Sequence, residues 1–165
     1  MAEGDSELQD LYRDVLLDYF KSAAHKGEIA EADIHSHGVN PVCGDEIEIS
    51  ASLTKDGGQE SRRLARLRYT GHGCVISQAS SAMMAEAMEG LSVAEARELA
   101  RAFKSMMLRE TPPEALPERL GEARAFEGVR KYPMRVKCAT LAWNTLLEGL
   151  KAPSDGAAST EFKEK

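Results

Sequence analysis

Three cysteines and one aspartate, spread over most of the chain, limit the folds and functions that are open to this sequence. They are Cys43 with Asp45, then Cys74, and then Cys138. Three thiolates and a carboxylate can complete one tetrahedral zinc site, in which a thiolate is either structural or reactive. Whether these residues do so depends on a fold that brings three distant segments to one point.

The cysteine count favours metal binding or catalysis over disulfides. Three cysteines cannot all pair within one chain, and the reducing cytosol disfavours disulfides. Residues 1–10 are acidic and polar, without the apolar run of a secretory signal, so we expect a cytoplasmic protein. No stretch approaches the roughly 20 apolar residues of a membrane helix, and the formal net charge of -6 argues against a large nucleic-acid interface. We therefore expect neither a membrane nor a nucleic acid as a partner.

The length of 165 residues fits a single domain with a modest core, because 42% of the residues are hydrophobic. We place that domain at residues 1–150. From 151 to 165 the residues are small, polar and charged, which predicts a disordered C-terminal tail.

Two segments alternate between apolar and polar residues, the pattern of half-buried strands. They are Ile47–Leu53 and Ala65–Tyr69, and the Asp-Gly-Gly sequence between them, within Lys55–Gln59, predicts a turn. The two strands should therefore pair antiparallel. We expect a third strand over Ile34–Val39.

Four longer segments repeat apolar residues at three- and four-residue steps, as on one face of an amphipathic helix. These predicted helices cover residues 8–24, 76–91, 92–107 and 133–150. Ser92 followed by Glu95 is a capping box, and Pro133 can open the last helix. Residues 121–128 predict a short helix or a turn. The patterns together predict an α+β fold, with a small three-stranded antiparallel sheet packed against about five helices.

Cys43 and Asp45 are suited to bind one ion together. They lie two residues apart, so in extended backbone both side chains point to the same side, and Gly44 lets the turn between them tighten. Cys74 stands in a glycine loop at the start of a predicted helix. Unpaired backbone amides and the helix dipole favour a thiolate at that position, so the pKa of Cys74 should fall.

Cys138 lies near the start of the last predicted helix, with Arg135 and Lys137 close by in sequence. Positive neighbours favour an ionised sulfur, so we expect the pKa of Cys138 to fall as well. Each residue also has an ordinary explanation: a cysteine can be a small buried apolar residue, and an aspartate can belong to a turn.

The spacing of the cysteines does not decide between these interpretations. The intervals are 31 residues (74 − 43) and 64 residues (138 − 74), unlike the short paired spacing of a zinc finger. Histidines widen the choice of ligands, because His35 and His37 can share one face of a strand and His72 can support Cys74. Surface histidines without a metal are the alternative.

Three sequence blocks resemble the IscU/SufU family of iron–sulfur cluster assembly proteins. They are Asn-Pro-Val-Cys-Gly-Asp at 40–45, Gly-Cys-Val-Ile-Ser-Gln-Ala-Ser-Ser-Ala-Met-Met at 73–84, and Arg-Val-Lys-Cys-Ala-Thr-Leu-Ala-Trp at 135–143.

Scaffold-type members of this family have a histidine immediately before the third cysteine, where this chain has Lys137. They also have a Leu-Pro-Pro-Val-Lys motif where this chain reads Tyr132–Lys137, and a shorter segment between the second and third cysteines. In these three features the chain resembles the SufU branch of the family. The insert at 109–128 either faces a partner or is only a longer connection between two helices.

The resemblance implies a zinc-dependent sulfurtransferase. Such a protein takes persulfide sulfur from a SufS-type pyridoxal-phosphate cysteine desulfurase and passes it toward the Suf cluster-assembly complex. The ligands of Zn²⁺ would be Cys43, Asp45, Cys74 and Cys138. Cys43 would accept the sulfur after a histidine of the desulfurase replaces it on zinc. Separately, from its positive charge beside the site, we expect Arg135 to help to dock that partner. Two alternatives stay open: a scaffold that assembles a [2Fe-2S] cluster on the same cysteines, and a non-catalytic structural zinc domain.

Overall fold

The computed structural model describes the backbone of residues 3–151 and 159–164, and the side chains from Asp10 onward. The elements follow one another as α1 (Glu3–Lys21), β1 (Ile34–Asn40), β2 (Asp45–Leu53), β3 (Leu64–His72), α2 (Val75–Met88), α3 (Val93–Met107), the 3-10 helices η1 (Pro113–Ala115) and η2 (Glu118–Lys131), α4 (Pro133–Lys151) and β4 (Ser159–Lys163). The predicted α+β class is confirmed, with α1 to α4 and η2 as the five longer helices.

The sheet has four strands in the described part of the chain, so the predicted three-stranded sheet was one strand short. Its order is β3-β2-β1-β4, in which β1, β2 and β3 pair antiparallel as expected and β4 pairs parallel with β1. Strand β4 falls within the tail for which disorder was predicted, and for Ser159–Lys163 that prediction was wrong. Residues 152–158 and 165 of the tail lie outside the described residues.

Contacts with the body of the domain explain why β4 forms in spite of its polar composition. The hydroxyl of Thr160 lies 2.7 Å from that of Ser36 on β1, and Phe162 packs against the core. Polar composition predicts disorder only where no partner strand is available to pair with the backbone.

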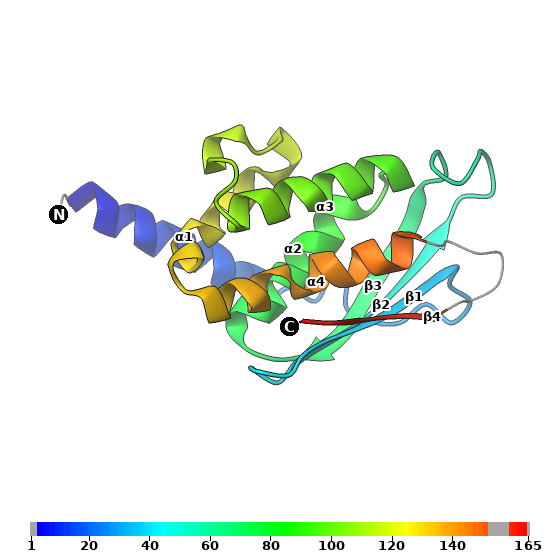
Figure 1. Ribbon diagram of the computed structural model, residues 1–165, viewed down its shortest axis with the longest axis horizontal. Coiled ribbons are helices and arrows are strands. Elements are labelled where there is room, and N and C mark those ends of the chain that lie inside the picture. The colour runs from blue at the N-terminus through cyan, green and yellow to red at the C-terminus, as the bar shows by residue number, and fades with distance from the viewer. Residues whose placement is uncertain (1–2, 152–158, 165) are drawn as a thin grey trace.

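The helices gather on one side of the sheet, and α4 runs along the sheet in the same view (Figure 1). Alternate residues of the strands face this helical layer, among them Ile34, Ile47 and Ile49, each at most 2% exposed. No helix in residues 3–151 is long and apolar enough to cross a membrane.

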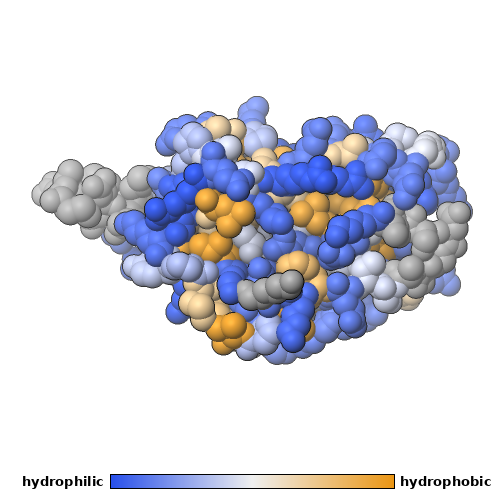
Figure 2. Space-filling view, in the orientation of Figure 1, coloured by the Kyte–Doolittle hydropathy of each residue, from blue (hydrophilic) through white to orange (hydrophobic). Residues whose placement is uncertain are grey.

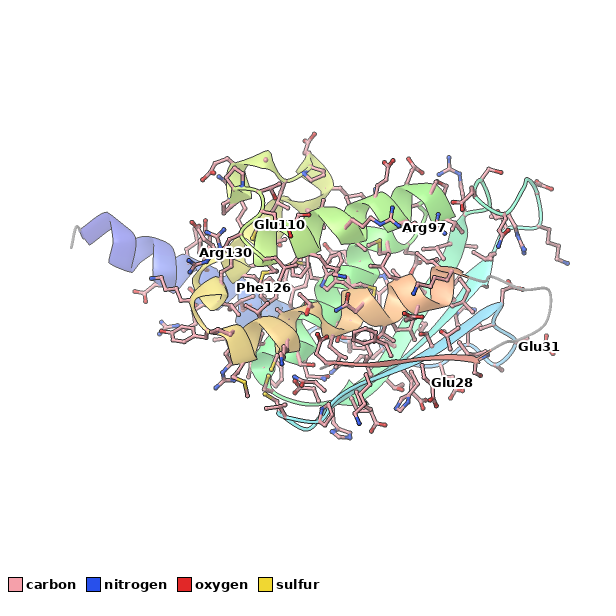
Figure 3. The ribbon with its side chains drawn as sticks, in the orientation of Figure 1. Glu28, Glu31, Arg97, Glu110, Phe126 and Arg130 are labelled. Carbon is pink, nitrogen blue, oxygen red and sulfur yellow. The ribbon has the colours of Figure 1, made fainter. Side chains whose placement is uncertain are left out.

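Helix η2 turns the insert between α3 and α4 into part of the core. The sequence predicted a short helix or turn at 121–128, and the structure has helical turns over Glu118–Lys131 that are interrupted by a kink at Leu120. Phe126 of η2, labelled in Figure 3, meets the ring of Phe103 edge to face at 5.7 Å between centroids. Phe103 in turn stacks on Trp143 of α4 at 4.2 Å. The insert therefore holds α3 and α4 together through an aromatic cluster.

A buried serine joins the two helices that carry Cys74 and Cys138. The hydroxyl of Ser80 on α2 donates to the carbonyl of Ala139 on α4, and it accepts the indole N–H of Trp143 at 2.8 Å. Because Ala139 follows Cys138 directly, this contact fixes the position of α4 along α2 next to Cys138.

Candidate metal centre

The β1–β2 hairpin presents Cys43 and Asp45 at its tip. Asn40 ends β1 and pairs with Asp45, the first residue of β2, so Pro41–Gly44 form the turn between them. Gly44 has φ of 71°, a left-handed conformation that favours glycine, and its N–H donates to the carbonyl of Asn40 at 2.9 Å. The turn leaves Cys43 exposed, whereas the side chain of Asp45 is directed inward and the residue is only 2% exposed.

Helix α4 brings Cys138 to the same point. One candidate ligand atom each from Cys43, Asp45 and Cys138 all lie within 4.8 Å of one another. Cys138 is fully buried, so the group has two buried members and one exposed member. It is the one group of at least three such metal-ligating side chains found in the described residues.

Cys74 adjoins this group without completing it. It caps α2, and its sulfur accepts the N–H of Ser77 at 3.4 Å. Its own N–H donates to Oδ1 of Asp45 at 3.0 Å. The structure thus places all four predicted residues at one point, with three of them in the compact cluster and Cys74 beside it.

The thiols of Cys74 and Cys138 affect each other's ionisation. The pKa of Cys74 is lowered to about 6, chiefly because the Cys138 thiol hydrogen-bonds to its sulfur, with smaller contributions from the amides of Ser77 and Ile76. The direction agrees with the expectation, although the helix amides are not its main cause.

The expectation for Cys138 was wrong in direction. Its pKa is raised, first because its thiol hydrogen-bonds to Cys74 and then because of burial, with Asp45 and Cys43 adding to the effect. The positive charges of Arg135 and Lys137 do not outweigh these causes. The two thiols therefore ionise as a coupled pair in which the loss of the second proton is disfavoured, and a bound cation would have to displace that proton.

Asn40 is the residue of this centre that the sequence analysis missed. It is fully buried, and its side-chain amide donates to Oδ2 of Asp45 at 3.2 Å and to the sulfur of Cys138 at 3.6 Å. Its Oδ1 has no hydrogen-bond partner among the described residues. The available signal was that Asn40 begins the block that carries Cys43 and Asp45.

Gly73 allows the close approach between Asp45 and the start of α2. A Cβ atom added at Gly73 would lie 2.4 Å from Oδ1 of Asp45, closer than Cβ atoms approach other atoms in proteins. The absence of a side chain here lets the carboxylate reach the N–H of Cys74.

The histidines stand outside the metal group. His37 and His72 both contact the carboxylate of Glu46, His72 at 3.0 Å. These contacts lower the pKa of Glu46, with His37 as the largest cause. His35 lies on β1 and likewise does not join the cysteines.

Arg135 and Lys137 lie in different surface hollows. Arg135 is exposed and lines a groove with Val75 and Tyr132, whereas Lys137 lines a separate pocket between α3 and α4. Only Arg135 shares its groove with a neighbour of Cys74. The two cations therefore face different surroundings.

The donor set suits zinc. Thiolates and a carboxylate are ordinary zinc ligands, and atoms about 2.0–2.3 Å from one ion lie roughly 3–4 Å from each other in a tetrahedron. The cluster of Cys43, Asp45 and Cys138 is close to that size. A cation would also compensate the buried carboxylate of Asp45, which accepts hydrogen bonds from the neutral amide of Asn40 and from the N–H of Cys74.

Comparison with known proteins places this centre in a family. The sequence model of the protein family called NifU-like N-terminal domain matches residues 11–139, which contain all four residues of the centre. The chain belongs to the NifU-like N-terminal domain family. The resemblance to IscU and SufU proteins is thereby confirmed, since both names occur among its relatives.

Other members carry two kinds of name. The chain is 36% identical to an iron-sulfur cluster assembly scaffold protein IscU of Streptococcus pyogenes, over 94% of this chain and 92% of that one. It is 32% identical to the zinc-dependent sulfurtransferase SufU of Bacillus subtilis, over 92% of this chain and 97% of that one. A crystal structure of a putative scaffold protein for the SUF system from Fervidobacterium islandicum superimposes with a TM-score of 0.73 at 35% identity, covering 83% of this chain and 94% of that one.

Proposed function

We propose that this member of the family is a zinc-dependent sulfurtransferase in iron–sulfur cluster assembly, with Cys43 as the sulfur acceptor. The observation that carries the proposal is the position of Cys43. It is an exposed cysteine on a hairpin turn, within 4.8 Å of a buried carboxylate and a buried thiol. A thiol placed in this way can belong to the centre and still meet a partner.

Zn²⁺ would be held by Cys43, Asp45, Cys74 and Cys138. When bound, zinc keeps thiolates deprotonated near neutral pH and has no redox chemistry of its own. Asn40 and the N–H of Cys74 orient the Asp45 carboxylate from two sides. The same contacts would keep Asp45 in place if Cys43 turned outward toward the partner.

The transfer itself is a thiol–persulfide exchange. The Cys43 thiolate attacks the outer sulfur of a cysteine persulfide on the partner, and the sulfur–sulfur bond to the partner's cysteine breaks. The partner's cysteine leaves as a thiolate, and Cys43 becomes the persulfide. No external electron donor or acceptor is needed, because one sulfur–sulfur bond replaces another.

Apolar residues exposed around the centre support the proposal that a partner protein binds there. The large apolar residues exposed near the ligands are Val42 at 54%, Val75 at 39%, Tyr132 at 60% and Met134 at 49%. Exposed apolar side chains grouped in this way are typical of interaction sites. We propose that a SufS-type pyridoxal-phosphate cysteine desulfurase docks here, with Arg135 assisting, and that the sulfur then passes to the Suf cluster-assembly complex in the cytoplasm.

A [2Fe-2S] scaffold is the second candidate. Relatives from Streptococcus pyogenes and Thermotoga maritima, at 36% and 35% identity, are named as scaffolds. Three cysteines and an aspartate can also hold such a cluster. Lys137 favours the sulfurtransferase. It occupies the position immediately before the third cysteine, where scaffold-type members of the family resemble one another in having a histidine.

Metal content and desulfurase activation together test the proposal. The protein is purified without added metal, its zinc and iron are measured, and sulfide release by the cognate desulfurase is followed with and without it. About one zinc per chain with strong activation supports the sulfurtransferase. Bound iron with a sulfide-containing chromophore and no activation supports the scaffold instead.

A further inference from the structure

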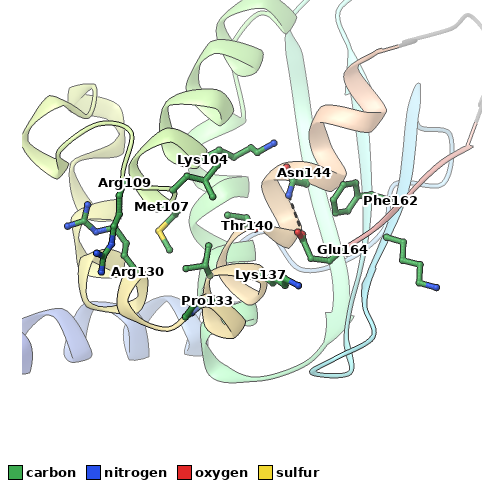
Figure 4. Close-up of a pocket in the computed structure, with 13 residues that line it drawn as sticks. Lys104, Met107, Arg109, Arg130, Pro133, Lys137, Thr140, Asn144, Phe162 and Glu164 are labelled. Carbon is green, nitrogen blue, oxygen red and sulfur yellow. Dashed lines mark hydrogen bonds between the residues drawn. The ribbon is translucent and has the colours of Figure 1, made fainter.

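A second hollow opens on the domain between α3, α4 and β4. It has a volume of about 630 Å³ and contains apolar side chains such as Met107, Val136 and Phe162. Figure 4 shows it in close-up, and Figure 2 shows apolar surface among hydrophilic residues on this face of the molecule. A hollow of this size can take one or two large side chains.

The rim of this hollow is strongly basic. Five basic residues line it against a single acidic one, Glu164, although the chain as a whole carries a net charge of -6. The basic residues come from five segments around the hollow: Lys104, Arg109, Arg130, Lys137 and Lys163. Because they surround the opening rather than converge on one point, they suit several separate negative charges better than one.

Three of these cations are available to a ligand. Arg130 is already engaged, since it lies 3.6 Å from the carboxylate of Glu127 and donates to main-chain carbonyls. By contrast, no hydrogen bond or ion pair within 4.0 Å joins the side chains of Lys104, Arg109 or Lys137 to another described residue, and Glu164 attracts Lys104 and Lys137 only at a longer distance. Unpaired cations beside apolar surface favour a ligand that carries both features.

The backbone at Arg109 is unusual. It is the one non-glycine residue in the described chain with a positive φ, at 63°. Side chains other than those of asparagine and aspartate rarely adopt this conformation. It places Arg109 next to Arg130 at one end of the hollow, as Figure 4 shows. The conformation is that of a Schellman cap at the end of α3, in which the N–H of Arg109 donates to the carbonyl of Met106 at 3.1 Å and the N–H of Glu110 to that of Ser105 at 2.8 Å.

Strand β4 shows which kind of chain the hollow accommodates. Phe162 and the following Glu164 both line it, two residues apart on an extended segment. The Glu164 carboxylate accepts the amide of Asn144 at 3.2 Å and is attracted by Lys104 and Lys137. An aromatic ring followed by a carboxylate therefore already fits part of the site.

We propose that this hollow docks an acidic, extended segment of a partner protein. An apolar side chain of the segment fills the hollow, and carboxylates on either side of it bind Arg109 and Lys137. Lys137 directly precedes Cys138, so a partner held here lies alongside the metal centre. The inference does not depend on which chemistry that centre performs.

Peptide binding tests the proposal on the zinc-loaded full chain. The probe is the capped peptide Asp-Glu-Phe-Asp-Glu, and the matched control is Asn-Gln-Phe-Asn-Gln, which has the same shape without charge. Backbone amide shifts in NMR spectra are followed during titration. The acidic peptide should saturate with shifts centred on the hollow, bind at least about tenfold more tightly than the neutral one, and weaken as salt is raised.

Two sets of variants locate the site. Lys104→Glu with Arg109→Glu should lower the affinity for the acidic peptide at least about tenfold. Lys21→Glu with Lys55→Glu changes the net charge equally at distant positions and should leave binding within about twofold. Arg109→Gly provides a second test, because glycine suits the positive φ there while the guanidinium is lost. This variant should fold normally and bind more weakly.

Several results would overturn the proposal. Equal binding of the neutral peptide would show that charge plays no part, and equal loss in both double variants would show that net charge alone attracts the peptide. Full binding by Arg109→Gly would remove that arginine from the site. Saturable binding of octanoate in the hollow without any response to the acidic peptide would make it a small-molecule site.

Discussion

The side-chain amide of Asn40 lies 3.6 Å from the sulfur of Cys138, although 98 residues separate them in the chain. The same nitrogen donates to Asp45, so one buried side chain orients two candidate ligands from different elements. Groups that orient metal ligands in this way usually affect metal affinity.

Asn40→Ala should therefore weaken zinc binding by about 10–100-fold while the protein remains folded. Competition with a chromophoric chelator measures the affinity, and circular dichroism checks the fold. Asn144→Ala is the matched control, since Asn144 is also nearly buried but bonds to Glu164 away from the centre. Equal zinc affinity in the Asn40 variant and the wild type would contradict the assigned role.

Cys43→Ala should fold and abolish sulfur acceptance, because the exposed thiol is lost while the buried part of the centre stays. Mass spectrometry after incubation with the desulfurase and cysteine detects the persulfide. Cys138→Ala serves as the comparison. It removes a fully buried side chain, so it should lower the free energy of unfolding by about 1–3 kcal/mol. A persulfide still formed on the Cys43 variant would exclude Cys43 as the acceptor.

Gly73→Ala should destabilise the centre, because the added Cβ would lie 2.4 Å from Oδ1 of Asp45. We expect a loss of about 1–3 kcal/mol in the free energy of unfolding, together with weaker metal binding. Gly121→Ala is the control, since its Cβ would meet nothing within 4 Å. Chemical denaturation of both variants measures the difference, and equal stabilities would show that the carboxylate can move aside without cost.

The longer elements were predictable because their signals are local. Alternation predicted β2 and β3, three- and four-residue steps predicted α2 and α3, and the capping box at Ser92 is present in the structure. Strand β4 was not predictable in this way. Its sequence has a single apolar residue, Phe162, and it forms through pairing with a strand more than a hundred residues earlier.

In the candidate centre too, residues with a local sequence signal could be predicted, whereas roles that depend on distant contacts could not. Its cysteines and Asp45 stand out by residue type, so they could be named from the sequence. The role of Asn40 depends on its register opposite Asp45 and on the approach of α4, neither of which a local pattern contains. The ionisation of Cys138 was predicted with the wrong sign for a related reason. Its neighbours in sequence are basic, but the hydrogen bond to Cys74 and then burial raise its pKa.

Glu164→Gln should stabilise the protein near pH 7 and have no effect near pH 4. Burial raises the pKa of Glu164 in the folded state, so folding is disfavoured where the carboxyl must ionise and is unaffected below its pKa in the unfolded chain. The expected result is a higher Tm for the variant at neutral pH, with the difference lost on acidification. Glu161→Gln, exposed on the same strand, should change Tm little at either pH. A lower Tm for the Glu164 variant at pH 7 would mean that its attraction to Lys104 and Lys137 outweighs burial.

The centre draws on the hairpin before β2, the cap of α2 and the first turns of α4, and this gives a bound ion a second effect. In the unfolded chain, an ion held by Cys43, Cys74 and Cys138 would close loops of 31 and 64 residues. Closing them costs chain entropy, so the ion acts as a cross-link between the first and last thirds of the domain, much as a disulfide would. Its removal by a chelator should therefore lower the unfolding temperature of the whole domain rather than loosen the hairpin alone.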